Sequence, residues 1–241
     1  MIPPWRKLCV LALLLQGLWH APLIRAELLS VELAGIDDEL RKNALAWLGD
    51  APTTPQARSN YLYSARGKVE QSLQALGYYR AEIDMDLNRD VTPWSLRISV
   101  QPGEPVRLRR IDINISGEGS SDAALSDVVA AAPLRMGAPL NHSEYERTRR
   151  SIATLAQQRG YFEGKFDTAR VEVEPVGGTA DVTLHYASGP RYTFGQLVHD
   201  QDIISEALLE PLITVREGEP YEQRRLSETQ AQLQRTGYFS T

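Results

Sequence analysis

The side chains that could do chemistry are few in this 241-residue sequence, and their spacing does not gather them into a site. Beyond residue 26 the histidines are His142, His185 and His199, which fall in different expected elements. A metal site needs several ligands brought close together, often at short spacings along the chain. This scatter favours histidines that face solvent over a metal centre.

None of the short motifs that carry an enzymatic mechanism is present. The sequence has no HExxH, no G-x-S-x-G, no phosphate-binding loop and no dinucleotide fingerprint. The glycine-rich stretch Gly117–Ser120 is typical of a surface turn, and Asp37-Asp38 is typical of a helix N-terminus, where carboxylates complement the dipole. We therefore expect no catalytic residue, no metal and no cofactor, and we predict that the protein is not an enzyme.

Two arginine-rich stretches also have simple structural interpretations. Arg107–Arg110 lies at a predicted boundary between domains, where we expect packing or ion pairs between the domains; contact with phosphate headgroups is the alternative. Glu146–Arg150 is typical of the solvated face of a helix. Neither stretch predicts a nucleic-acid site, because the net charge of the whole chain is -5.

Residues 1–26 are typical of a secretory signal peptide. Arg6 and Lys7 precede an apolar run over residues 8–19, which is shorter than the roughly 20 residues that span a bilayer. We expect cleavage after Ala26, with an uncleaved anchor as the alternative. The only cysteine, Cys9, would be removed, so the exported chain could form no disulfide.

The rest of the chain is an internal repeat. A glycine followed by two aromatic residues occurs at residues 77–79, 160–162 and 237–239, each time at the end of a helical pattern. The glycine-rich turns around Gly103 and Gly189, and those around Gly137 and Gly218, recur at nearly the same step. A step of about 80 residues is longer than the periods of helical solenoids and indicates small domains in tandem.

Each repeat predicts the order β-α-α-β-β. In the first repeat, the apolar periodicity favours strands over residues 28–33, 79–87 and 94–100, with two helices between the first and the second strand. The second repeat has the same order, with an irregularity in its first strand between Leu108 and Ile111 and a capping box, formed by Ser143 and Glu146, at the start of its second helix.

The third repeat is predicted to be incomplete. A strand over residues 191–198 and two helices are expected, but no closing hairpin precedes Thr241. We interpret the chain as the front part of a longer protein, with a degenerate third unit as the alternative.

The glycine-aromatic motif predicts a corner between a helix and a strand. Glycine just past a helix end adopts a left-handed conformation at little cost, and the next residue packs back on the last turn. The second aromatic residue is then expected to begin the following strand. A contact between the exposed aromatic edge and a partner is the alternative. The predicted corner residues are Gly77, Tyr78, Gly160, Tyr161, Gly237 and Tyr238.

A signal peptide followed by such units resembles the N-terminal region of Omp85-family outer-membrane assembly proteins, which carry POTRA (polypeptide-transport-associated) domains. Within that family the sequence "GPRYTFGQLVHD" looks most like the TamA type (translocation and assembly module). The resemblance implies an α+β fold of tandem POTRA domains, each a three-stranded mixed sheet covered by two helices. The expected domains are residues 27–101, 102–188 and an incomplete 189–241.

The resemblance also implies a function. The chain would be a periplasmic arm at the Gram-negative outer membrane, followed by a β-barrel that this sequence does not contain. Its expected partners are an inner-membrane-anchored TamB-like protein and unfolded outer-membrane clients, autotransporters among them. The alternatives are a freestanding periplasmic scaffold that binds peptides or cell wall, or the arm of another Omp85 protein such as a two-partner-secretion transporter.

The same resemblance implies that the second strand of each domain is a sheet edge. An edge strand offers unpaired amides and carbonyls to which an extended segment can add. Rigid spacing, with partner contacts through other faces, is the alternative. The candidate residues for edge pairing are Ile83, Asp84 and Met85 in the first domain and Val171, Glu172 and Val173 in the second.

Overall fold

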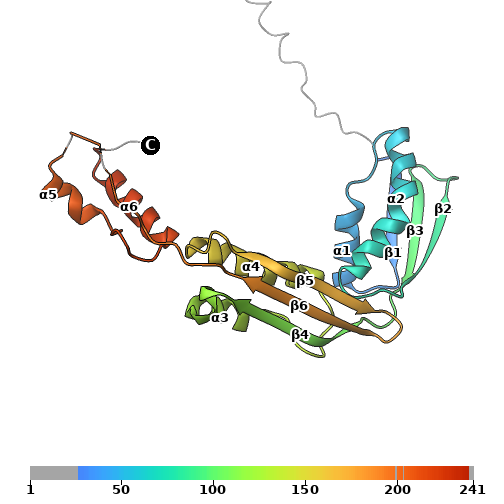
Figure 1. Ribbon diagram of the computed structural model, residues 1–241. Coiled ribbons are helices and arrows are strands. Elements are labelled where there is room, and N and C mark those ends of the chain that lie inside the picture. Colours follow the sequence, from blue (N-terminus) through green and yellow to red (C-terminus); the bar gives the residue numbers. More distant parts are fainter. Residues whose placement is uncertain (1–26, 199, 203, 239–241) are drawn as a thin grey trace, which may run out of the picture.

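The computed structural model describes residues 27–198, 200–202 and 204–238, which form a series of units along a bent line (Figure 1). Two units have the full β-α-α-β-β order, and a helical segment follows them. We call these the first unit (residues 29–101), the second unit (residues 107–187) and the third unit (the described residues from 191 onward). The predicted α+β fold of tandem repeats is confirmed.

The first unit consists of a sheet with two helices on one face. Its elements are β1 (Leu29–Ala34), α1 (Asp38–Leu48), α2 (Pro55–Gln74), β2 (Glu82–Asn88) and β3 (Trp94–Gln101). The strand order is β1-β3-β2, with β1 parallel and β2 antiparallel to β3. The helices begin where side chains cap them, because Asp37 accepts from the Leu40 amide and Thr54 from the Ala57 amide.

The second unit repeats this topology. Its elements are β4 (Arg107–Ser116), a 3₁₀ turn η2 (Glu118–Ser121), α3 (Ala123–Ala130), α4 (His142–Gln158), β5 (Lys165–Glu174) and β6 (Thr179–Ala187), in the order β4-β6-β5. The register of β4 shifts between Leu108 and Arg110, as predicted. The predicted capping box is wrong: Asn141 caps α4 by accepting from the Ser143 amide, and Glu146 pairs with Arg149.

The third unit has α5 (Glu206–Leu209), a 3₁₀ turn η3 (Glu210–Leu212) and α6 (Gln223–Arg235). The strand predicted over residues 191–198 is not formed; only an isolated bridge joins Thr193 to Pro220. The equivalent β4 is held by a ladder to β6, and among the described residues no strand lies beside 194–198. No helix in the described part of the chain is long and apolar enough to span a membrane.

Candidate functional site

The two glycine-aromatic corners of the complete units have the same hydrogen bonds. Gly77 and Gly160 lie in the positive-φ region, at 93° and 90°. The Tyr78 amide donates to the Leu73 carbonyl at 3.0 Å, and the Tyr161 amide donates to the Ala156 carbonyl at 3.0 Å. These bonds close the C-termini of α2 and α4, since they satisfy carbonyls that the helix leaves free.

The second aromatic residue of each corner does not begin the next strand, so that part of the prediction is wrong. β2 starts at Glu82 and β5 at Lys165, three residues beyond Tyr79 and Phe162 respectively. Tyr79 packs instead against the core of the second unit. Phe162 packs edge-on against Tyr192 and Tyr221 of the third unit, with ring centroids 5.4 and 4.9 Å away. Each second aromatic residue therefore contacts the following unit.

The corners are the points at which one unit docks on the next. The Gly77 carbonyl accepts from the Val106 amide at 2.9 Å, and the Gly160 carbonyl accepts from the Tyr192 amide at 2.9 Å. Val106 and Tyr192 open the second and the third unit. The sequence pattern alone does not reveal this docking role, although the glycine-rich turns just before these residues recur in step with the corners.

Glycine is needed at these two corners for space as well as for conformation. A Cβ on Gly77 would lie 2.7 Å from the Leu140 carbonyl oxygen, and one on Gly160 would lie 2.9 Å from the Tyr221 Cβ. Gly237 also has a positive φ, but nothing described lies within 4 Å of its Cβ position, and Tyr238 is 60% exposed. The third corner thus repeats the turn without a docked unit among the described residues.

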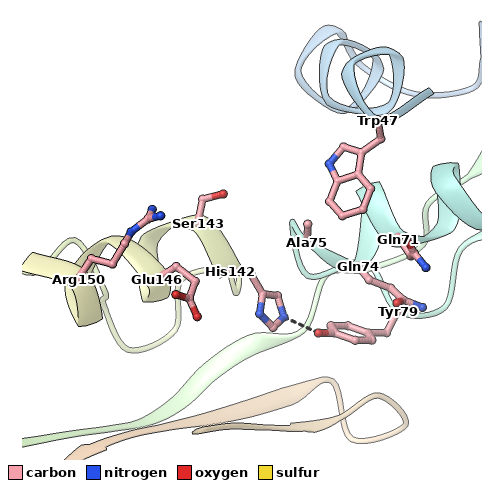
Figure 2. Close-up of a pocket in the computed structure, with 9 residues that line it drawn as sticks. All are labelled: Trp47, Gln71, Gln74, Ala75, Tyr79, His142, Ser143, Glu146 and Arg150. Carbon is pink, nitrogen blue, oxygen red and sulfur yellow. Dashed lines mark hydrogen bonds between the residues drawn. The ribbon is translucent and has the colours of Figure 1, made fainter. Parts of the chain in front are cut away.

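The junction between the first and second units, the first junction, has no ion pair between the two units among the described residues. The Tyr79 hydroxyl and His142 Nε2 are 2.6 Å apart, and the His142 amide donates to the Ala75 carbonyl at 2.9 Å. Burial lowers the pKa of His142, although Glu146 acts in the opposite direction. The expectation of a solvated His142 is wrong, because the ring is half-buried at this contact. Figure 2 shows the two side chains meeting near the N-terminus of α4, with Trp47 in the lining of the same hollow.

The junction between the second and third units, the second junction, is charged. Asp122 accepts from Arg159 Nε at 2.7 Å and from the Tyr161 hydroxyl at 3.1 Å, and its side chain is 3% exposed. Arg191, from the segment that opens the third unit, lies 3.9 Å from Asp122 and 3.5 Å from Glu222. Burial acts to raise the pKa of Asp122, but the hydrogen bonds from Arg159 and Tyr161 outweigh it and hold the pKa below its usual value.

The candidate edge residues lie in the outermost strands. β2 pairs only with β3, and β5 only with β6, among the strands of the described residues. Asp84 and Glu172 are exposed. The flanking apolar residues are half-buried against the helices; they are Ile83, Met85, Val171 and Val173.

The arginine-rich stretch that opens β4 does not link domains, so that expectation is wrong. Arg109 pairs with Asp181 and Arg110 with Asp112, while the Arg107 guanidinium donates to the Gly137 carbonyl. All of these partners belong to the second unit.

His185 and His199 are the other histidines that are expected to face solvent. His185 Nε2 lies 3.3 Å from Asp112 Oδ1 on a half-exposed sheet face. His199 and Phe239 lie outside the described residues. Within the part of the chain that the structure describes, no group of three or more His, Cys, Asp or Glu side chains could hold a metal ion.

Two family models match the chain. The model described as POTRA domain TamA domain 1 matches residues 30–102, and the POTRA model, described as surface antigen variable number repeat, matches residues 110–189. Together they cover more than half of the chain. The chain therefore belongs to the family of POTRA-domain proteins.

The first unit further defines the type within that family. Its match is to the first POTRA domain of TamA, so the resemblance to the TamA type is confirmed at the level of this domain.

Solved structures of POTRA regions are also similar to the chain. The chain is 21% identical to Haemophilus influenzae BamA POTRA3-5, with a TM-score of 0.47, and the match covers 90% of this chain and 87% of that one. It is 15% identical to the N-terminal domain of Omp85 from Thermosynechococcus elongatus, with a TM-score of 0.34 and coverage of 86% and 84%. It is 15% identical to POTRA1-3 of the periplasmic domain of Omp85 from Anabaena, with a TM-score of 0.35 and coverage of 88% and 85%.

Proposed function

We propose that this chain is the exported, periplasmic POTRA arm of a TamA-type outer-membrane translocation and assembly factor. It binds partner and client proteins while outer-membrane proteins, autotransporters among them, are inserted. Its role is that of a scaffold, with no chemical step at any residue. An inner-membrane-anchored TamB-like protein and unfolded outer-membrane clients are its partners.

The free outer edges of β2 and β5 carry this proposal. Each of these strands is hydrogen-bonded on one side only among the described residues, so the opposite side presents amides and carbonyls to solvent. An extended segment that adds to such an edge binds through main-chain groups. Binding of this kind tolerates many sequences, which suits a receptor for many unfolded clients.

The charges along these edges are compatible with that role. The outward residues of β2 include Glu82, Asp84 and Asp86, which keep two copies of the edge from pairing with each other. A client strand does not repeat this pattern of charge, so it can still add to the edge. The same residues thus discourage aggregation without closing the edge.

Site-specific photocrosslinking in living cells tests the proposal. A photoreactive residue at Asp84 or Glu172, both exposed on the outer strands, should yield adducts with outer-membrane protein precursors and with the inner-membrane-anchored partner. The matched controls are Arg97 and Ser99, which are exposed on β3, the central strand of its sheet. Equal adducts at all four positions, or none at Asp84 and Glu172, would contradict edge pairing.

A further inference from the structure

One exposed face of α4 lies in a shallow groove that continues over all three units. A hollow of about 540 Å³ at the first junction is lined by Trp47, Gln71 and Arg150, among others. A middle hollow of about 360 Å³ shares Arg150 with it, and a third hollow of about 470 Å³, which reaches α6, shares Leu155 and Gln158 with the middle one. Figure 1 shows α4 between α1 of the first unit and α6 of the third. We call this surface the α4 groove.

The middle of the α4 groove carries two arginines without partners. Neither Arg147 nor Arg150 has a hydrogen bond or an ion pair with any described residue, whereas Arg149 between them takes up Glu146. The middle hollow contains no carboxylate. Like charges one helical turn apart destabilise a helix. The chain is acidic overall, so these two guanidiniums form an exposed positive site within a negative protein.

The walls of the groove suit a polypeptide. The side chains of Gln71, Gln158 and Thr154 can both donate and accept hydrogen bonds, as a peptide group does. Trp47 is 43% exposed at one end, and Leu155 lies between the other two hollows, so each can receive an apolar side chain. Guanidinium groups bind carboxylates through two parallel hydrogen bonds.

We propose that the α4 groove binds an extended, acidic segment of a partner polypeptide, with its carboxylates on Arg147 and Arg150. The 17 residues of α4 span about 25 Å, which about eight extended residues cover. This surface is separate from the sheet edges, and the inference does not depend on edge pairing.

Fluorescence anisotropy with two synthetic peptides tests the inference. The first probe is a labelled 12-residue peptide of alternating aspartate, serine and leucine, and the second has asparagine in place of every aspartate. The full chain should bind the aspartate peptide at least tenfold more tightly than the asparagine peptide. Arg147→Glu with Arg150→Glu should abolish this difference, and Arg147→Gln with Arg150→Gln should reduce it.

A matched pair of charge reversals is the control. Arg80→Glu with Lys165→Glu changes the net charge equally at two exposed residues that have no described partner and lie outside the groove. This variant should bind the aspartate peptide as the parent chain does, and far-ultraviolet circular dichroism should be unchanged in every variant.

Three outcomes would overturn the inference. They are failure of the aspartate peptide to bind, equal binding of both peptides, and an equal loss of binding in the control variant. Displacement of the peptide by an uncharged N-acetylglucosamine oligomer would overturn it as well, because it would show that the groove is a glycan site instead. Crosslinking at Asp84 and Glu172 should persist in the Arg147→Glu, Arg150→Glu variant, which separates this test from that of the edges.

Discussion

The first and second junctions share one backbone arrangement. In both, the glycine carbonyl of the corner accepts the amide that opens the next unit, from Val106 or from Tyr192. The carbonyls of these two residues accept in turn from the amides of Leu140 and Tyr221, at 2.9 Å in each case. The main chain of one junction therefore repeats that of the other.

The side chains of the two junctions differ in kind. The first has a hydroxyl-imidazole contact, and no ion pair joins its two units among the described residues. The second has a buried carboxylate with two arginines, and an aromatic cluster around Tyr221. The repeated backbone sets how the units meet, and the side chains set which conditions loosen each contact.

Alanine at the corner glycines should have the largest effect and should distinguish the three copies. A positive φ costs an alanine about 1–2 kcal/mol at each position. At Gly77 and Gly160 the added Cβ also overlaps the next unit, and overpacking costs a further 1–3 kcal/mol or so. We expect Gly77→Ala and Gly160→Ala to lose about 3 kcal/mol of unfolding free energy in denaturant titrations, and Gly237→Ala about 1 kcal/mol. An equal loss at all three would refute a docking role.

Asp122→Asn should weaken only the second junction. Asparagine keeps the cap on α3, since it is as good an N-cap as aspartate, but it removes the charge that Arg159 and Arg191 face. Hydrogen bonds to charged groups contribute roughly 1.5–3 kcal/mol, so we expect a loss of about 2 kcal/mol. Asp127→Asn, exposed on the same helix, should change stability by less than about 0.5 kcal/mol.

Distances between spin labels would assign this effect to a junction. In a Cys9→Ser background, labels at Glu172 and Gln234 span the second junction, and labels at Arg66 and Glu172 span the first; all three sites are exposed. Asp122→Asn should broaden the first of these distance distributions and leave the other unchanged. Broadening of both would mean that the two junctions are coupled.

Acidification should loosen the first junction before the second. Because burial lowers the pKa of His142, its contribution to stability is present above the ordinary value of 6.5 and is lost as the pH falls below it. Because the pKa of Asp122 is lowered, the contribution of its carboxylate to stability is lost only as the pH falls below the ordinary value of 3.8. Between pH 7.5 and 5 the Arg66–Glu172 label distances should broaden and the Glu172–Gln234 distances should not. His142→Gln, which retains every other histidine, should remove the response.

Patterns among residues close together in the sequence were sufficient to predict much of the fold. Helical and alternating periodicities gave the order of elements, and the glycine after each helix gave the turn that Gly77 and Gly160 make. The bulge in β4 was visible as a change of apolar phase. These features depend on residues close together in sequence, so a single repeat contains the information for them.

The contacts between repeats were not predictable in the same way. Tyr79 and His142 are 63 residues apart, and nothing in either local pattern pairs them. The strand predicted over 191–198 does not form for a related reason. An alternating apolar pattern does not make a strand unless a neighbouring strand pairs with it, and here only an isolated bridge is present. The α4 groove also depends on three units meeting, so Arg147 and Arg150 were interpreted only as part of a solvated helix face.

Salt should have the smallest effect and, unlike acid, should loosen the second junction. Arg159 and Glu222 pair across the second junction at 3.5 Å, and their side chains are 23% and 30% exposed, so added ions reach this pair. No ion pair joins the first and second units among the described residues. Partly exposed pairs contribute about 1 kcal/mol or less. Between 0.05 and 1 M sodium chloride at pH 7.5, the Glu172–Gln234 distances should broaden slightly and the Arg66–Glu172 distances should stay narrow. Asp122→Asn should reduce this salt response. A larger response at the first junction would contradict the assignment of the ion pairs to the second junction.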